Sequence, residues 1–179
     1  MIKDIKKVLL TEEQILERVR EIGKSISKDY EGKDLLVVGI LKGSVLFASD
    51  LIKNITIPCE IDFMAVSSYG SSTETSGVVR ILKDLDHSIE GKDIIIVEDI
   101  IDSGVTLDYL LKYLKARKAN SIEIVTLLTK PARRKVDIEV KYCGFEVPDE
   151  FLVGYGLDFA EKYRNLPYVG ILKEEVYKK

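Results

Sequence analysis

The stretch Asp93-Ile-Ile-Ile-Val-Glu-Asp-Ile-Ile-Asp-Ser-Gly-Val-Thr-Leu107 joins an apolar run to a group of acids and a short polar loop. The apolar run, residues 94–97, consists of β-branched residues and indicates a strand that is buried on both faces. Glu98 and Asp99 follow the run directly, and Asp102 comes soon after. In open α/β sheets, ligands bind at the carboxyl ends of the strands. The stretch therefore predicts an α/β fold with a ligand site at this edge of its sheet.

The loop that follows has the composition of a phosphate-binding turn. Gly104 allows the backbone to approach a ligand closely, and Ser103 and Thr106 add hydroxyl donors. The free N–H groups of the loop and of the first turn of the next helix point at one spot, where the helix dipole favours an anion. Glu98, Asp99 and Asp102 could accept ribose hydroxyls or a hydrated Mg²⁺. The simpler alternative is a strand–turn–helix in which the acids only cap the helix.

Length and composition narrow the class of protein. The chain has 179 residues, which suits a single domain, and its net charge of −3 argues against a dedicated nucleic-acid surface. No apolar run is long enough for a membrane helix, so we expect no membrane partner and a cytoplasmic location. Cys59 and Cys143 lack metal-ligand spacing and are expected to be free thiols. His87 is the only histidine, which makes Ser-His-Asp hydrolysis a poor interpretation.

A second strand–loop–helix unit precedes the first. Residues 35–40 form an apolar run, Leu41-Lys-Gly-Ser44 is a short loop, and a helical pattern continues to about residue 53. Lys42 adds a positive charge beside Gly43, so this loop is a second candidate anion site. An earlier helix is predicted over residues 11–29, where Thr11-Glu-Glu-Gln14 is a capping box.

A polar segment separates two further strands, which are predicted over residues 60–66 and 78–83 and are expected to pair as a hairpin. Residues 67–77 are nearly all small and polar, and Tyr69 is the one large side chain among them. The segment is either a plain flexible loop or a lid that excludes water from a reaction.

The run Val97-Glu-Asp-Ile-Ile-Asp-Ser-Gly-Val-Thr106 resembles the phosphoribosyl-pyrophosphate (PRPP) motif of type I phosphoribosyltransferases, and in detail that of the hypoxanthine-guanine branch. The resemblance implies one domain with a central, mainly parallel sheet flanked by helices. It also implies a core of about residues 30–140 and a small hood from about 1–15 and 141–179. Val105 stands where some members of the family carry lysine, and Leu152 stands where valine is common.

The resemblance also implies roles for particular residues. Ribose and PRPP binding fall to Glu98, Asp99, Asp102, Ser103, Gly104, Val105 and Thr106; pyrophosphate binding to Lys42, Gly43 and Arg164; purine binding to Lys130, Phe151, Leu152 and Asp158; the lid to Ser68 and Tyr69; and the metal to Glu98, Asp99 and Asp158. In the family, the peptide bond that corresponds to Leu41–Lys42 is cis. Asp102 would be the catalytic acid/base, and Mg²⁺ would be the cofactor.

The implied activity is transfer of a 5-phosphoribosyl group from PRPP to N9 of hypoxanthine or guanine, by a homodimer or homotetramer. Three alternatives stay open. The first is the same reaction on another base, such as xanthine. The second is a non-catalytic regulator that senses PRPP or a nucleotide, with RNA as a possible ligand. The third is a receiver-like domain phosphorylated on its acids, in which the Lys42 loop and the Phe151 region would have no role.

Overall fold

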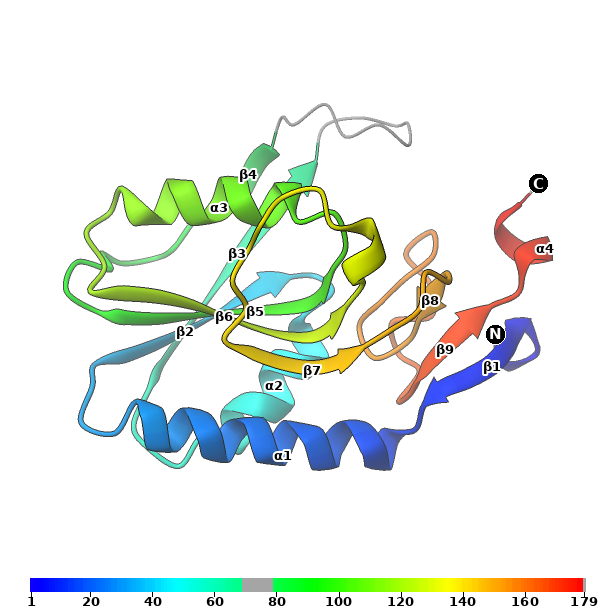
Figure 1. Cartoon of the computed structure of the whole chain (residues 1–179), viewed down its shortest axis with the longest axis horizontal. Helices are drawn as coiled ribbons and strands as arrows, with labels where there is room; N and C mark the ends of the chain where they lie inside the picture. Colours follow the sequence, from blue (N-terminus) through cyan, green and yellow to red (C-terminus); the bar gives the residue numbers. More distant parts are fainter. Residues whose placement is uncertain (69–78, 179) are drawn as a thin grey trace.

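A six-stranded sheet forms the centre of the chain in a computed structural model that describes residues 1–68 and 79–178 (Figure 1). The strand order is β4-β3-β2-β5-β6-β7, and every neighbouring pair is parallel except the antiparallel pair β3–β4. The strands are β2 (Leu35–Leu41), β3 (Glu60–Ser68), β4 (Val79–Lys83), β5 (Asp93–Ile101), β6 (Ser121–Thr129) and β7 (Tyr142–Glu146). The predicted α/β class and the predicted hairpin of the third and fourth strands are confirmed.

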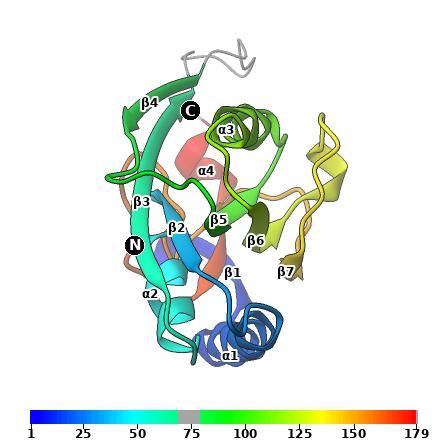
Figure 2. The ribbon, with the colours of Figure 1, turned by 90° about the vertical axis from the view of Figure 1, so that its left-hand side faces the viewer.

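Helices cover both faces of this sheet (Figures 1 and 2). Helices α1 (Glu12–Asp29) and α2 (Val45–Lys53) lie on one face, and α3 (Val105–Lys115) lies on the other. The capping box at the start of α1 is formed, because Thr11 accepts a hydrogen bond from the Gln14 amide and Gln14 accepts one from the Thr11 amide. The two faces therefore have separate apolar layers.

Strand β5 contributes to both layers, as the apolar run predicted. Ile95 and Val97 pack in the layer under α1 and α2, whereas Ile94 and Ile96 pack in the layer under α3. All four side chains are fully buried. The strand continues to Ile101, so Glu98 and Asp99 lie inside its carboxyl-terminal half rather than beyond its end.

A second, three-stranded sheet joins the two ends of the chain. Its order is β1 (Ile5–Leu10), β9 (Val169–Leu172) and β8 (Leu152–Val153), and all pairs are antiparallel. It lies beside the carboxyl ends of the large sheet, together with the short helix α4 (Glu174–Tyr177) (Figure 1). The 3-10 turns Ile2–Asp4 and Pro131–Arg133 complete the elements.

The small sheet is built from the two segments that were assigned to the hood, residues 1–15 and 141–179. Strand β7 belongs to the large sheet and lies beyond residue 140, where the expected core was to end. The exact division into core and hood stays a prediction. Cys59 and Cys143 are free thiols, as expected. No helix within residues 1–68 and 79–178 has both the length and the apolar character needed to span a membrane.

Candidate active site

Two adjoining cavities open at the carboxyl ends of the central strands. The larger has a volume of about 590 Å³, and its lining includes Asp99, Lys130, Phe151 and Asp158. The smaller has a volume of about 190 Å³ and is lined by the following residues: Ile40, Val66, Glu98, Ile100, Ile101, Asp102, Ser103, Gly104, Thr106 and Leu107. Ile100 and Asp102 line both cavities. Asp102 therefore stands at the boundary between the two halves of the site.

The loop after β5 forms the floor of the smaller cavity. Gly104 has φ = 82°, a left-handed conformation that favours glycine, and it directly precedes the first turn of α3. Ser103 Oγ lies 3.4 Å from the Val105 amide as an acceptor. The amides of Ser103, Gly104 and Thr106 have no hydrogen-bond partner among the described residues. These amides and the helix dipole are suited to an anion, and binding of a phosphate by this loop stays a prediction.

The two neighbouring acids of β5 point into different cavities. Glu98 lines the smaller one and Asp99 the larger one, because successive side chains of a strand point to opposite faces. Burial, with a further contribution from the Asp99 charge, raises the pKa of Glu98 well above its ordinary value. Burial also raises the pKa of Asp99 to about 6, although a hydrogen bond from the Ile100 amide (2.7 Å) and the charge of Arg164 oppose the rise. In the free protein, the negative charges of the two carboxylates are thus only weakly stabilised by their surroundings.

The loop between β2 and α2 lies against Asp99. A methyl group added to Gly43 would overlap Asp99 Oδ2, and one added to Gly156 would overlap the carbonyl oxygen of Gly43. The peptide bond between Leu41 and Lys42 is cis, which confirms the expectation from the family. Segments that are far apart in the sequence, 41–44, 98–99 and 154–156, therefore meet closely, and only glycine fits at two of the contact points.

Lys42 and Arg164, the two cations expected to bind pyrophosphate, share one carboxylate. Lys42 Nζ lies 2.7 Å from Glu161 Oε2, and the Arg164 guanidinium lies 3.3 Å from Glu161 Oε1. Arg164 also donates to the Gly156 carbonyl (2.7 Å) and forms an ion pair with Asp158 Oδ1 (3.0 Å). The fold thus brings these two cations together, as a pyrophosphate site requires.

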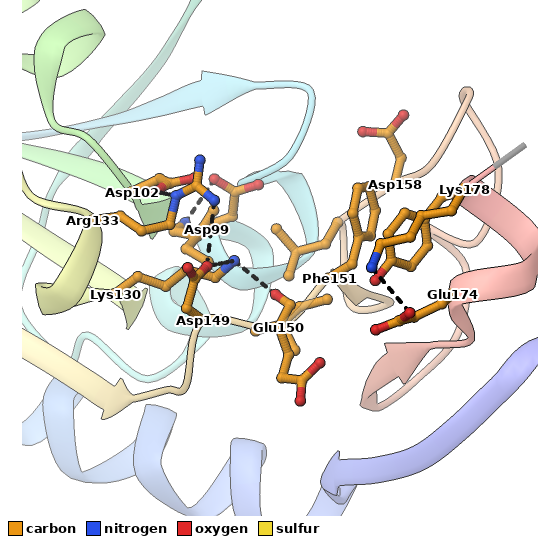
Figure 3. Close-up of a pocket in the computed structure, with 14 residues that line it drawn as sticks. Asp99, Asp102, Lys130, Arg133, Asp149, Glu150, Phe151, Asp158, Glu174 and Lys178 are labelled. Atoms are coloured by element: carbon orange, nitrogen blue, oxygen red, sulfur yellow. Dashed lines mark hydrogen bonds and ion pairs between the residues drawn. The ribbon is translucent and has the colours of Figure 1, made fainter. Parts of the chain in front are cut away.

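The larger cavity carries the residues expected to bind a purine (Figure 3). Lys130, only 8% exposed, donates from Nζ to the Glu150 carbonyl at 2.7 Å. The Phe151 ring is stacked on Tyr177 with 4.7 Å between ring centroids, and it meets Phe159 edge-on at 5.6 Å. Leu152 is buried and also lines the cavity. A cationic donor and an aromatic ring from different elements therefore face one space.

Asp102 forms an ion pair that the sequence analysis did not anticipate. Arg133 Nε lies 2.7 Å from Asp102 Oδ1, and the same guanidinium reaches Asp149 Oδ1 at 3.3 Å. Lys130 Nζ lies 3.8 Å from that Asp149 oxygen. The carboxylate of Asp102 is therefore linked through Arg133 and Asp149 to Lys130, the residue expected to bind a purine (Figure 3).

The residues of the expected metal site, Glu98, Asp99 and Asp158, do not form a closed cage. No group of three or more acidic, histidine or cysteine side chains suited to a metal ion occurs in the described ranges 1–68 and 79–178. Mg²⁺, however, usually keeps several waters and is held by one or two carboxylates together with substrate phosphates. Asp99 and Asp158 both line the larger cavity, and the charge of Asp158 raises the pKa of Asp99. The donors present fit a cation that arrives with a phosphorylated substrate.

Comparison with known proteins agrees with this geometry. A family model described as "Phosphoribosyl transferase domain" matches residues 7–160. The hypoxanthine-guanine phosphoribosyltransferase of Bacillus subtilis (strain 168) is 58% identical over 174 residues, which cover 97% of each chain. The chain belongs to the hypoxanthine-guanine phosphoribosyltransferase family. A crystal structure of a hypoxanthine phosphoribosyltransferase from Staphylococcus aureus has a TM-score of 0.97 at 59% identity and covers 100% of this chain and 97% of that one.

Some relatives within this phosphoribosyltransferase family are much longer. The bifunctional protein TilS/HprT of Listeria monocytogenes (serotype 4b, strain F2365) is 56% identical over 177 residues, which are 99% of this chain and 27% of that protein. This chain therefore spans about a quarter of the length of those relatives.

The family resemblance assigned roles to the loop after β5 and to Lys130, but nothing in the sequence pointed to four residues that the structure places at the candidate site: Arg133, Asp149, Glu161 and Tyr177. Each lies in a connection or at a chain end, where periodicity says nothing about contacts. Charged residues just after a strand's carboxyl end were the one available hint, and this hint applies to Arg133. Of the two lid residues, Ser68 ends β3, whereas Tyr69 lies outside the described residues.

Proposed function

We propose that this chain transfers the 5-phosphoribosyl group of PRPP to N9 of hypoxanthine or guanine and releases IMP or GMP with pyrophosphate. The observation that carries the proposal is the position of Asp102, which lines both the anion cavity and the purine cavity. A group at that boundary lies where a ribose on one side would be joined to a base on the other. Family membership gives the reaction class.

The smaller cavity would hold the 5-phosphate. The amides of Ser103, Gly104 and Thr106 are donors with no partner in the described part of the chain. The hydroxyls of Ser103 and Thr106 and the start of α3 also favour a dianion there. Glu98 and Asp99 would accept the ribose hydroxyls. Lys42, the Gly43 backbone and Arg164 would bind the pyrophosphate, since a fork-shaped guanidinium and a lysine suit phosphate oxygens.

The larger cavity would hold the base. Lys130 would donate to O6 of the purine, and such a donor disfavours adenine, whose amino group is itself a donor. Phe151 would stack on the ring, and the Leu152 backbone would contact its edge. Asp158 would approach the exocyclic group of guanine.

Asp102 would act on the proton of the purine. As the bond from N9 to C1′ forms and the bond from C1′ to the pyrophosphate oxygen breaks, the base loses a proton at N7, and the Asp102 carboxylate is the acceptor beside it. A positioned acid/base is typically worth about 10²–10⁴ in rate. The ion pair with Arg133 fixes the orientation of that carboxylate before the base arrives.

Mg²⁺ would be held by Asp99 and Asp158, with Glu98 nearby, and it neutralises charge on the pyrophosphate when bound. The partly buried carboxyl of Asp99, whose pKa is raised chiefly by loss of hydration, supports a cation at this point. We also propose that the segment around Ser68 and Tyr69 is a lid, that the chain forms a homodimer or homotetramer, and that it works in the cytoplasm on small-molecule substrates rather than on nucleic acid or at a membrane.

The decisive experiment is a steady-state assay of hypoxanthine, guanine and xanthine, each with PRPP and Mg²⁺, that follows both pyrophosphate release and the nucleotide formed. Hypoxanthine and guanine should be consumed with equal amounts of nucleotide and pyrophosphate. Preference for xanthine would change the assigned base. Binding of PRPP without release of pyrophosphate in the presence of any of the three purines would favour a regulator. Asp102→Asn is the matched inactive variant.

A further inference from the structure

The carboxylate of Glu161 lies between the two cations of the expected pyrophosphate site. One of its oxygens is 2.7 Å from Lys42 Nζ, and the other is 3.3 Å from the Arg164 guanidinium. A carboxylate that offers one oxygen to each of two cations makes the contacts that a bridging phosphate would make. Lys42 forms no other ion pair within residues 1–68 and 79–178, so in this structure its charge is directed at Glu161 alone.

Arg164 does not depend on Glu161 for its orientation. Its guanidinium donates to the Gly156 carbonyl at 2.7 Å and pairs with Asp158 Oδ1 at 3.0 Å. The Gly156 amide in turn donates to the Arg164 carbonyl at 3.0 Å, so backbone and side chain are both anchored. Arg164 Nε is buried and has no hydrogen-bond partner among the described residues, which leaves a donor for a further oxygen. Loss of the Glu161 carboxylate would therefore leave Arg164 in place.

Glu161 is also easily displaced. The side chain of Glu161 is 64% exposed and that of Lys42 is 67% exposed. Ion pairs between exposed side chains contribute little to the free energy of unfolding. Residues Ala160 and Glu161 have φ values of 52° and 63°, at the tip of a short turn closed by hydrogen bonds between Phe159 and Lys162. Because the turn is closed at its base, the side chain can leave the cations without a change in the core.

We propose that Glu161 is an internal competitor for the pyrophosphate subsite, which binds Lys42 and Arg164 when no diphosphate is present and is displaced by PRPP or pyrophosphate. This inference rests on the proposed function, because it assigns a diphosphate to these two cations. Its consequence is that Glu161 weakens the binding of both ligands and speeds the release of pyrophosphate. Glu161 is thus a residue that sets affinity rather than a catalytic residue.

The test compares the wild-type chain with Glu161→Gln and Glu161→Ala, with Glu90→Gln as the control for net charge. Glu90 is exposed and precedes the amino end of β5, at the opposite end of the sheet from the site. Calorimetric titration with magnesium pyrophosphate should give a Kd about two- to tenfold lower in both Glu161 variants, the size expected from the loss of two exposed ion pairs. The KM for PRPP should fall similarly, the KM for hypoxanthine should stay unchanged, and the difference in Kd should shrink in 0.5 M KCl.

The opposite sign would overturn the proposal. If Glu161 only ordered the turn or held Arg164, both variants would bind pyrophosphate more weakly and would melt at a lower temperature than the wild type. An unchanged Kd would also refute competition. The titration needs no turnover, so it decides the role of Glu161 even if no purine is consumed, whereas absence of purine turnover in the wild type refutes the proposed function instead.

Discussion

Replacement of Asp99 by asparagine should stabilise the free protein while it damages PRPP binding. Asp99 is held in a partly buried position beside Glu98 and Asp158, and its pKa is raised from 3.8 to about 6. A rise of this size corresponds to at most about 3 kcal/mol against the ionised form. Asparagine keeps the oxygen that accepts the Ile100 amide at 2.7 Å and removes the charge. The variant should therefore avoid the cost of burying an ionised carboxylate.

The effect must depend on pH in a defined direction. A carboxyl whose pKa is higher in the folded state favours folding below its unfolded pKa, and this contribution is lost as pH rises through the folded value of about 6. The advantage of Asp99→Asn should therefore be largest at pH 8, about half as large at pH 5, and absent below the ordinary pKa of 3.8. For a chain of this size, about 3 kcal/mol corresponds to a rise in Tm of about 6–12 °C.

Thermal unfolding of both proteins at pH 8, 6.5 and 5, without Mg²⁺ or PRPP, measures this difference. Asp137→Asn is the matched control, because Asp137 is exposed and should show no such pH-dependent gain. Addition of Mg²⁺ and PRPP should raise the Tm of the wild type more than that of the variant. The reasoning is refuted if Asp99→Asn melts at or below the wild-type temperature at pH 8, or if the difference in Tm stays constant from pH 8 to pH 5.

Three further substitutions separate the parts of the site. Asp102→Asn should lower kcat by about 10²–10⁴ with the Kd for PRPP retained, as checked by steady-state kinetics and calorimetry; turnover equal to the wild type would exclude Asp102 as the acid/base. Lys130→Ala should raise the KM for hypoxanthine with little change in the Kd for PRPP, because only the donor to the base is lost; unchanged affinity for hypoxanthine would contradict that role. Gly43→Ala should raise the KM for PRPP about tenfold or more, because the added methyl group would overlap Asp99 Oδ2 and push the loop and this carboxylate apart. A KM for PRPP equal to that of the wild type would show that the loop accommodates the methyl group without loss of PRPP binding.

Interactions between residues that are close in the sequence determined the main helices and strands. The apolar run before Glu98 required a strand buried on two sides, and the structure places its alternate residues in the layers under α1 and α3. The capping box at Thr11 fixed the start of α1. Gly104 at φ = 82° supplied the turn into α3. These features depend on residues that are close in sequence, and so this one amino-acid sequence was sufficient to predict them.

The tertiary structure alone decided how the distant segments of the site contact one another. The family resemblance assigned Lys42, Gly43 and Arg164 to one subsite, but it gave no contacts between them. Nothing in the local pattern of residues 154–164 indicates that Gly156 touches Gly43 or that Glu161 lies between Lys42 and Arg164. Those contacts arise because the small sheet carries the C-terminal segment to the carboxyl ends of the large sheet. The alternation of β5 likewise separates Glu98 from Asp99, so adjacent acids serve different cavities. The sequence by itself determined the loop at 102–106 and the strand that precedes it, whereas the ion pairs of Asp102, Lys42 and Arg164 depend on long-range packing that no local pattern encodes.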